Sequence, residues 1–343
     1  MSGVTIAIDC MGGDFGPSVT VPAVGRVLNE YPDTIFRLFG NPAQIKEQLS
    51  HLKLSDHGNI RIVESTDDVL MIDPPALALK NKKNSSMRLA LESVRDGKAN
   101  ACVSAGNTGA LMAISRFVLK MLPGIDRPAI ISAIPTLKND HVYMLDLGAN
   151  IDCDEHRLTQ FAIMGDQLAK SIDQVNSPRV ALLNIGSEDN KGSEKIRRAG
   201  EIISSLGFIN YAGFIEGNEI FNGNHHVIVT DGFTGNNVLK TSEGFSHFLN
   251  KKIKDAFKKN LWTKFCGLLA KPVLSAFKHE VNPEKYNGAC LMGLRGIVIK
   301  SHGGANVNAT YYAIKEAIEQ SRQKVPQRIR EQLEAAKREV NSL

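Results

Sequence analysis

The chain has 343 residues, of which 43% are hydrophobic and 22% charged, so it can bury a substantial core as one large or two ordinary domains. This composition excludes a disordered chain. Every stretch of 18 residues carries charge, and no basic segment precedes a long apolar run near the start, so we expect a cytoplasmic protein without a secretory signal or a membrane-spanning helix. The five cysteines are widely spaced and lack a C-x-x-C pair, which argues against a disulfide framework or a zinc site.

Short apolar runs that are typical of buried strands alternate with helical patterns along the chain. We expect strands at residues 4–9, 35–39, 60–63, 101–103, 129–134, 142–147, 180–185, 208–213, 227–230 and 296–300. We expect helices at about 18–29, 43–50, 85–96, 108–121, 155–171 and 193–205, a long helical region from 235, and a closing helix from 308. This alternation predicts an α/β fold with a mainly parallel, doubly wound sheet and right-handed crossovers.

The same patterns predict the domain organisation. We place one α/β catalytic domain at residues 1–324, with a helical hairpin inserted at about 243–285 and a charged helical tail at 325–343. Pro326 interrupts the helical pattern where the tail begins, so we expect the final helix to be loosely attached.

Six of the expected strands end in loops that are rich in glycine, amide and hydroxyl residues. These loops begin near Cys10, Ser104, Gly148, Gly186, Asp231 and Ser301. Because ligands of open α/β sheets bind in the crevice at the carboxyl ends of the strands, we expect the six loops to line one pocket. Each loop taken alone can be an ordinary strand-to-helix turn, since the same residue types dominate turns.

The composition of these loops favours an anion as the ligand. Glycine lets backbone N–H groups approach an oxyanion closely, and a helix that starts after the loop adds its positive end. Thr108 and Thr234 can cap such helices and donate hydroxyl hydrogens, while Asn107, Asn150 and Asn236 can donate amide hydrogens.

A lysine-rich segment interrupts the alternation. Residues 251–278 contain eight lysines and one acidic residue, Asp255, and apolar residues recur every four positions between 249 and 269. Three interpretations fit this pattern: a core-facing helix with a solvated lysine face, a dimer-forming helical hairpin, and an interfacial helix on an anionic bilayer. The last two are compatible with each other.

The usual signatures of P-loop, dinucleotide, zinc-hydrolase and nucleophile-elbow sites are absent from the sequence. We interpret the acids at 152–155 as the start of a helix and expect neither a metal nor a cofactor. Phosphate carries its own nucleophilic oxygen, so its attack on an activated acyl group needs positioning and oxyanion stabilisation rather than a dedicated serine or cysteine. Lys191, Lys240 and Lys300 are candidates for an anion-binding charge, although each can equally be a solvated lysine.

Seven longer strings make the chain similar to a known family. IAIDCMGGDFGP, SSMRLALE, VSAGNTGALM, LDLGANIDC, LLNIGSEDNKG, TDGFTGNNVLKTSEG and YNGACLMGLRGIVIKSHG follow one another between about Ile6 and Ser321, and together they resemble the PlsX family of acyl-carrier-protein (ACP):phosphate acyltransferases. The departures are small: Cys10 stands where alanine is common, and residues 304–306 are one of several variants. The resemblance implies a homodimer with a three-layer α/β/α fold similar to phosphotransacetylases and to isocitrate and isopropylmalate dehydrogenases.

The resemblance also implies the reaction, in which long-chain acyl-ACP and inorganic phosphate give acyl phosphate and free ACP in phospholipid biosynthesis, without a cofactor. We predict that backbone N–H groups of residues 106–109 and 232–235 hold the phosphate, and that Lys191, Asn107 and Asp231 are the catalytic residues. The candidate phosphate- and substrate-binding residues are Asp9, Gly12, Gly13, Asp14, Ser104, Gly106, Thr108, Gly109, Asn150, Gly232, Thr234, Gly235, Asn236 and His302.

Within this resemblance the lysine-rich segment has two candidate roles. Its lysines at 251, 252, 258 and 259 can steer the docking of acidic ACP, and an apolar tip can contact an anionic membrane surface. The tip residues are Leu261, Trp262, Phe265, Leu268 and Leu269. We therefore expect peripheral association with the inner face of the cell membrane and functional coupling to the membrane glycerol-3-phosphate acyltransferase, and we expect no nucleic-acid partner.

Two alternatives remain at this point. One is a phosphotransacetylase that acts on short acyl-CoA, and the other is a non-enzymatic lipid-binding scaffold with a vestigial pocket.

Overall fold

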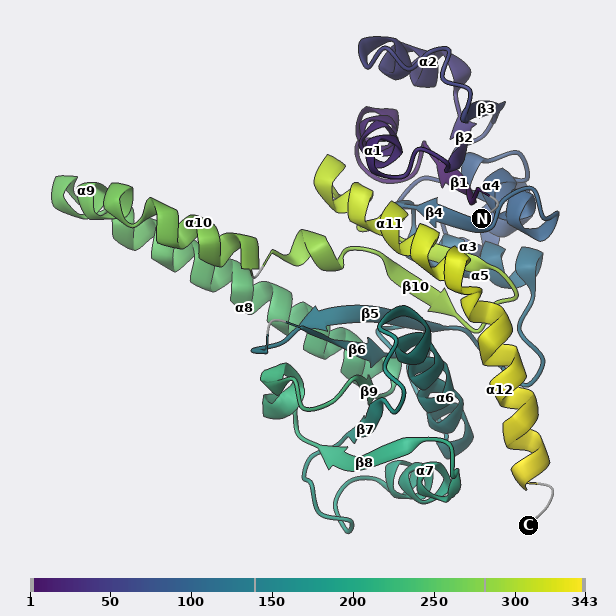
Figure 1. Ribbon diagram of the computed structural model, residues 1–343, viewed down its shortest axis with the longest axis vertical. Coiled ribbons are helices and arrows are strands. Elements are labelled where there is room, and N and C mark those ends of the chain that lie inside the picture. The colour runs from purple at the N-terminus through teal and green to yellow at the C-terminus, as the bar shows by residue number, and fades with distance from the viewer. Residues whose placement is uncertain (1–2, 139, 281, 341–343) are drawn as a thin grey trace.

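In the computed structural model, which describes residues 3–138, 140–280 and 282–340, an eleven-stranded mixed sheet runs through the molecule with helices on both faces (Figure 1). The strand order is β3-β2-β1-β4-β11-β10-β5-β6-β9-β7-β8. The strands are β1 (Thr5–Asp9), β2 (Ile35–Gly40), β3 (Ile60–Glu64), β4 (Ala101–Ser104), β5 (Ala129–Pro135), β6 (His141–Leu145), β7 (Arg179–Leu183), β8 (Asn210–Ile215), β9 (Val227–Val229), β10 (Ala289–Met292) and β11 (Ile297–Lys300). This is the three-layer α/β architecture that the sequence predicts.

The helices of the body are α1 (Pro17–Glu30), α2 (Pro42–His51), α3 (Pro75–Asn81), α4 (Ser86–Arg95), α5 (Thr108–Leu119), α6 (Glu155–Ile172), α7 (Glu194–Ser205), α11 (Val307–Gln323) and α12 (Val325–Val340). Helices α8 (Gly232–Lys258), α9 (Leu261–Leu269) and α10 (Lys271–Glu280) form a hairpin, and the short 3-10 helices are η1 (Gly217–Asn222) and η2 (Pro283–Tyr286). Helix α3 and strand β10 are absent from the sequence-based predictions.

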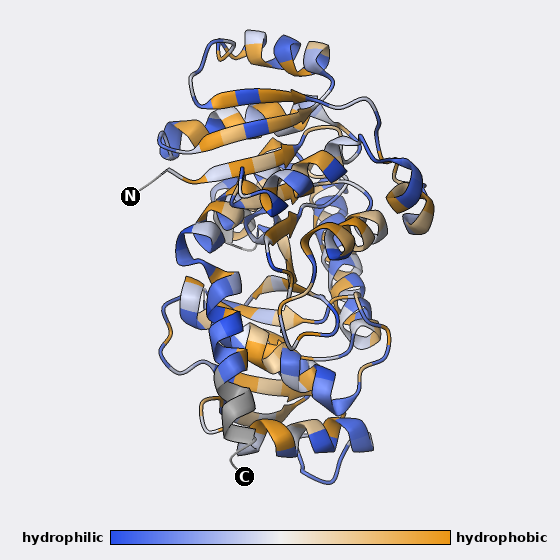
Figure 2. Cartoon of the chain, turned by 90° about the vertical axis from the view of Figure 1, so that its right-hand side faces the viewer, coloured by the Kyte–Doolittle hydropathy of each residue, from blue (hydrophilic) through white to orange (hydrophobic). Residues whose placement is uncertain are grey.

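The core lies on both faces of the sheet because alternate residues of a strand point to opposite faces. In β1, Ile6 and Ile8 belong to one buried cluster and Ala7 to the other, and Val227 and Val229 are separated from Ile228 in the same way in β9. Figure 2 shows the result as hydrophobic strands at the centre with hydrophilic residues on the outer faces of the helices.

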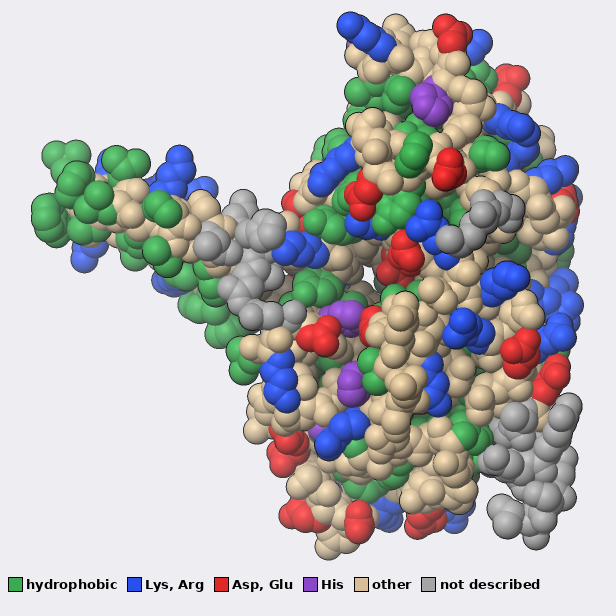
Figure 3. All heavy atoms as spheres, in the orientation of Figure 1, with side chains coloured by type: hydrophobic (Ala, Val, Ile, Leu, Met, Phe, Trp, Pro, Cys, Tyr) green, Lys and Arg blue, Asp and Glu red, His purple; other side chains and the backbone are tan. Residues whose placement is uncertain are grey.

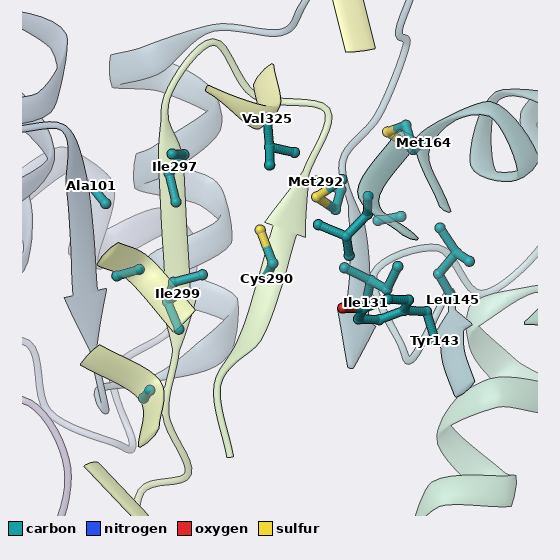
Figure 4. Close-up of a cluster of buried hydrophobic side chains, with 14 of the residues drawn as sticks. Ala101, Ile131, Tyr143, Leu145, Met164, Cys290, Met292, Ile297, Ile299 and Val325 are labelled. Atoms are coloured by element: carbon teal, nitrogen blue, oxygen red, sulfur yellow. The ribbon is translucent and has the colours of Figure 1, made fainter. Parts of the chain in front are cut away.

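The C-terminal helix is firmly packed, which corrects the prediction of a loosely attached tail. Val325, Ile329 and Leu333 are at most 4% exposed, and α12 packs against α6. Figure 4 shows Val325 in the hydrophobic cluster that includes Cys290 and Met292. The three residues recur every four positions and thus share one face of the helix, which the high charge of this segment obscures in the sequence.

The hairpin of α8, α9 and α10 projects from the body of the molecule (Figure 1). Helix α8 begins at the sheet and carries the chain outward, α9 packs against it at the far end, and α10 leads the chain back toward the body. Phe257 of α8 lies where a Cβ on Gly267 of α9 would make close contact, so glycine lets the two helices approach each other. Within the described residues, no helix has the length and apolar character needed to cross a membrane.

Candidate functional site

The strand directions divide the predicted loops into two groups. Strand β10 runs antiparallel to β11 and β5, and β5 runs antiparallel to β6, so β6, β9 and β7 run opposite to β1, β4 and β11 along the sheet. The first loop group (residues 10–16, 104–107 and 301–306) therefore lies along one edge, and the second loop group (residues 146–154, 184–193 and 230–236) along the other. The prediction that all six loops share one edge is wrong, because alternating strand and helix patterns do not reveal three antiparallel pairs at the centre of a sheet.

Direct contacts hold the first loop group together. The N–H of Asp14 donates to the carbonyl oxygen of Gly303, and the N–H of Ser301 donates to that of Ser104, each across 2.9 Å. A Cβ on Gly12 would stand 2.7 Å from the backbone nitrogen of Gly106, so glycine is required for this approach. The loops after β1, β4 and β11 thus form one continuous surface.

Asp9 forms the buried base of this group. Its carboxylate accepts hydrogen bonds from the hydroxyls of Ser86 and Ser104, each at 2.6 Å, and the Ser104 oxygen accepts in turn from the N–H of Gly106 at 3.1 Å. Burial raises the pKa of the Asp9 carboxyl, and the hydrogen bonds from the two serines oppose that rise. With its oxygens engaged in this way, Asp9 orients the loops rather than acting as a base.

Asn107 caps helix α5 and fastens a neighbouring loop. Its Oδ1 accepts from the N–H of Ala110 at 3.0 Å, and its Nδ2 donates to the carbonyl oxygens of Met71 and Asp73 at 2.8 and 3.0 Å. Asn107 rather than Thr108 is therefore the capping residue, and its amide hydrogens are already used. The prediction that this amide donates to phosphate does not fit the structure.

The first turn of α5 keeps donors that can bind an anion. A helix leaves its first N–H groups without intrahelical acceptors. In the described part of the chain, the cap from Asn107 satisfies Ala110, and we find no acceptor for the N–H groups of Thr108 and Gly109. Thr108 is exposed, so its hydroxyl can join these two N–H groups in one anion site.

Lys300 supplies a buried positive charge to the same group. It ends β11 beside Ser104 of β4, is 9% exposed, and donates from Nζ to the carbonyl oxygen of Ala105 at 3.3 Å and to that of Ser301. Burial lowers the pKa of its ammonium to about 8, while Asp9 and Asp14 oppose that shift by favouring the charged form. An ammonium held here is poised to attract a further anion.

Asp146 organises the second loop group. Its carboxylate accepts from the N–H groups of Ile130, Ala149 and Asn150 at 2.9, 3.0 and 2.7 Å, and from the side-chain amide of Asn150 at 2.9 Å. Burial raises the pKa of this carboxyl, against the effect of those hydrogen bonds. Asn150 also donates from Nδ2 to the carbonyl oxygen of Pro128 at 2.8 Å, so its amide is used within the fold.

Helix α8 starts in close contact with this group. Asp231 caps the helix by accepting from the N–H of Thr234 at 2.7 Å, the N–H of Gly232 donates to the carbonyl oxygen of Asn150 at 2.7 Å, and that of Gly235 donates to Asp231. Asn236 lies against Gly148. Three of the four N–H groups in residues 232–235 therefore already have acceptors, which argues against the predicted phosphate cradle at this helix.

Lys191 lies in the loop after β7, exposed to solvent. Its carbonyl oxygen accepts from Asn184 at 3.1 Å, and Lys195 in the first turn of the following helix α7 forms an ion pair of 2.9 Å with Asp152 of the second group. The structure places Lys191 with the second group, whereas His302 belongs to the first group and Thr108 follows that group as the first residue of α5. His302 accepts at Nδ1 from the N–H of Gly304 and keeps its own loop folded.

The acidic run after β6 is a helix start, as the sequence predicts: Asp154 caps α6 by accepting from the N–H of Arg157 at 2.8 Å. Among the residues that the structure describes, no cluster of three or more His, Cys, Asp or Glu side chains could hold a metal ion.

Sequence reasoning missed two residues that organise the loops. Ser86 follows the cap of α4 in the SSMRL string, and Asp146 is the acid in LDLGAN, directly after β6. A carboxylate between a buried strand and a glycine is a usable signal for Asp146. Nothing in the sequence pairs Ser86 with Asp9, which lies 77 positions away.

The hairpin presents its apolar residues to solvent. Leu261, Trp262, Phe265, Leu268 and Leu269 are between 50% and 84% exposed, and Figure 3 shows hydrophobic side chains gathered at the far end with lysines beside them. The rings of Trp262 and Phe265 lie 5.9 Å apart. Of the three interpretations of this segment, a core-facing helix is therefore excluded for the tip.

Comparison with known proteins gives consistent results along the whole chain. Residues 4–328 match the fatty acid synthesis protein family. The chain is 48% identical over 342 residues to a phosphate acyltransferase from Shewanella halifaxensis (strain HAW-EB4), with 100% of both chains covered. It is also 48% identical over 329 residues to one from Methylococcus capsulatus (strain ATCC 33009 / NCIMB 11132 / Bath), with 96% of each chain covered.

Solved structures show the same fold in more distant proteins. A phosphotransacetylase from Streptococcus pyogenes superposes with a TM-score of 0.63 at 17% sequence identity, covering 93% of this chain and 94% of that one. At this identity the likeness concerns the fold alone.

Proposed function

The chain belongs to the PlsX family of phosphate acyltransferases, and from this premise we propose that it transfers a long-chain acyl group from acyl-ACP to inorganic phosphate, giving acyl phosphate and free ACP. The observation that carries the proposal is the similarity to phosphate acyltransferases over the full length of the chain. The anion donors at the start of α5, beside the buried ammonium of Lys300, support it independently.

We place the phosphate at the start of α5. The N–H groups of Thr108 and Gly109, the Thr108 hydroxyl and the positive end of the helix act as donors, and Lys300 lies behind the loop. A phosphate oxygen attacks the thioester carbonyl carbon, a tetrahedral oxyanion forms, and the C–S bond breaks. The carrier's thiolate leaves without a strong acid, because a thiol has a pKa of only about 8.5.

The second loop group supports the fold around this chemistry. We retain Lys191 and Asp231 as candidates for contacts with the substrate, since both lie in loops at the carboxyl ends of strands. Among the residues that the structure describes, we find no contact between these two and the first loop group. We therefore assign phosphate binding to Thr108 and Lys300.

We further propose that the enzyme is a homodimer that works at an anionic membrane surface and hands its product to the membrane glycerol-3-phosphate acyltransferase. The exposed apolar tip and the surrounding lysines support membrane contact, because such a combination suits an anionic bilayer. Acyl phosphate is poorly soluble and reactive, which favours delivery beside the bilayer.

The test uses the purified chain, long-chain acyl-ACP and a series of phosphate concentrations. We expect phosphate-dependent loss of the thioester and an equal amount of acyl phosphate, trapped by hydroxylamine as a hydroxamate. Competition between acyl-ACP and acetyl-CoA in one reaction separates this function from that of a phosphotransacetylase. Thioester loss that does not depend on phosphate would reject the proposal, and no loss at all would favour the non-enzymatic scaffold.

The phosphate position has its own matched pair of variants. Thr108→Val and Thr234→Val remove the same hydroxyl from the first turn of two different helices. We expect Thr108→Val to raise the KM for phosphate and Thr234→Val to leave it near the wild-type value. The reverse result would move the phosphate to α8.

A further inference from the structure

A groove between α3 and α5 lies outside both loop groups. Its volume is about 500 Å³, and it is lined by Leu79, Ala113, Arg116, Phe117, Lys120 and Met121. Four of these six residues are apolar, two are basic and none is acidic. The groove thus combines apolar lining residues, its apolar floor, with two exposed basic residues, Arg116 and Lys120, which form its basic rim.

Two cations lie close to an aromatic ring that lines the groove. Phe117 is 51% exposed, Lys120 Nζ lies 4.8 Å from its ring centre, and Arg88 Cζ lies 5.4 Å from it. Arg88 is paired with Glu92 at 3.1 Å. Within the described residues, Arg116 and Lys120 take part in no ion pair, so their charges are available to a partner.

More positive charge follows the groove along the chain. Lys80, Lys82 and Lys83 come directly after Leu79, at the end of α3. Exposed aromatic and arginine side chains on an apolar floor are typical of the centre of a protein interface. A rim of unpaired cations selects a partner with acidic groups on its surface.

The position of the groove relates it to the anion site. Helix α5 begins at Thr108 in the anion site, and its second half, from Ala113 to Leu119, forms one wall of the groove. With a rise of about 1.5 Å per residue, its 12 residues span about 18 Å. A carrier seated on the groove would therefore sit one helix length from the phosphate, within reach of a substrate that it presents on an extended prosthetic arm.

We propose that this groove docks the acidic carrier protein that delivers the acyl thioester. The inference rests on the proposed function, because it names the docking surface for the donor of that reaction. An acyl chain alone would cover the apolar floor but leave Arg116 and Lys120 without counter-charges. The hairpin lysines, by contrast, surround a large apolar tip that suits a bilayer.

The test compares two donors and two pairs of lysine or arginine residues. The groove variant, Arg116→Glu with Lys120→Glu, reverses the charge of the groove. The hairpin variant, Lys251→Glu with Lys252→Glu, makes the same charge change on the hairpin. We expect the groove variant to raise the KM for acyl-ACP about tenfold or more at low salt and to weaken its salt dependence. Its kcat, and its rate with an acyl-pantetheine thioester that lacks the carrier protein, should stay within about twofold of the wild type.

The possible outcomes separate docking from chemistry. A wild-type KM for acyl-ACP in the groove variant, or a tenfold rise in the hairpin variant alone, would overturn the proposal. An equal loss with both donors would also overturn it, because the groove would then serve the reaction itself. Should the charge reversals unfold the chain, Arg116→Gln with Lys120→Gln gives the same comparison.

Failure of the proposed function would look different, since the wild-type chain would then form no acyl phosphate from either donor. In that event, the docking proposal can still be tested by binding alone. Fluorescence anisotropy would measure the affinity of carrier protein without an acyl group for the wild-type chain and for the groove variant. We expect at least about tenfold weaker binding by the groove variant.

Discussion

The ammonium of Lys300 donates to the carbonyl oxygen of Ala105 across 3.3 Å, which ties the last residue of β11 to the loop that leads into α5. This contact holds a buried charge behind the loop that leads to the proposed phosphate position. Because burial lowers the pKa of this ammonium to about 8, its charge is lost within an accessible pH range.

We therefore predict that kcat/KM for phosphate falls as the pH rises through about 8, since that parameter reports groups of the free enzyme and the protonated lysine is the form that attracts phosphate. Lys300→Arg should remove this fall, because an arginine stays charged throughout the range. Lys300→Met should raise the KM for phosphate at pH 7 by about tenfold or more, because the positive charge behind the loop is lost.

The measurement is a phosphate titration of acyl phosphate formation between about pH 6.5 and 9.5. The ionisation of phosphate itself affects all variants equally, so the comparison of the wild-type profile with that of Lys300→Arg is decisive. Identical profiles would show that the charge of Lys300 does not act on phosphate binding.

Gly235 is held against the second loop group, which gives a matched pair of variants within one helix. A Cβ at position 235 would overlap the carbonyl oxygen of Asp146, whereas one at Gly244, further along α8, would meet nothing within 4 Å. We expect Gly235→Ala to lower the free energy of unfolding by about 1–3 kcal/mol, because α8 must shift away from the sheet. Gly244→Ala should raise it by up to about 1 kcal/mol, because alanine favours a helix.

Urea unfolding of the two variants checks this prediction. Equal effects would show that α8 is not fixed at its first turn. A lower free energy of unfolding for Gly244→Ala alone would indicate a contact to the hairpin from a second copy of the chain.

Local patterns in the sequence predict the strands and helices well, because the formation of each strand or helix depends largely on residues that are close together in the chain. The apolar runs and their turns locate ten of the strands, and the glycine-rich strings around residues 106–109 and 232–235 mark the real starts of α5 and α8. The four-residue apolar repeat also reveals the hairpin and its exposed tip. The sequence analysis did not predict strand β10, because the string ACLM is short and lies between glycines at 288 and 293, a pattern that is typical of a loop.

Relationships over long distances in the chain could not be predicted. The opposite direction of β6 relative to β4 follows from the antiparallel pairing of β5 and β10, whose registers no local pattern encodes. The amide of Asn107 is used by Met71, 36 positions earlier, so its availability to a ligand is decided by tertiary contacts. Hence residue types at the site can be proposed from sequence, but not which of their donors stay free.

The exposed tip of the hairpin predicts reversible membrane binding. We expect the wild-type chain to sediment with vesicles that contain anionic lipid, and Leu268→Glu with Leu269→Glu to abolish sedimentation while soluble activity is retained. These two leucines are 66% and 65% exposed, so the change removes membrane contact without disturbing a core.

A matched control introduces the same chemistry elsewhere. Leu137 and Ile185 are each 80% exposed on the body of the molecule, and their replacement by glutamate should leave sedimentation unchanged. If the tip variant still sediments, or the control variant does not, the tip is not the membrane contact.

The last helix contributes to the stability of the fold through its buried face. Ile329 is 1% exposed within the main core cluster, so Ile329→Ala should lower the free energy of unfolding by about 2–5 kcal/mol. Arg330 is the next residue and is exposed, with an i,i+4 ion pair to Glu334. We therefore expect Arg330→Ala to change the free energy of unfolding by less than about 1 kcal/mol. Urea unfolding followed by circular dichroism measures both, and equal small effects would mean that α12 detaches before the rest of the molecule unfolds.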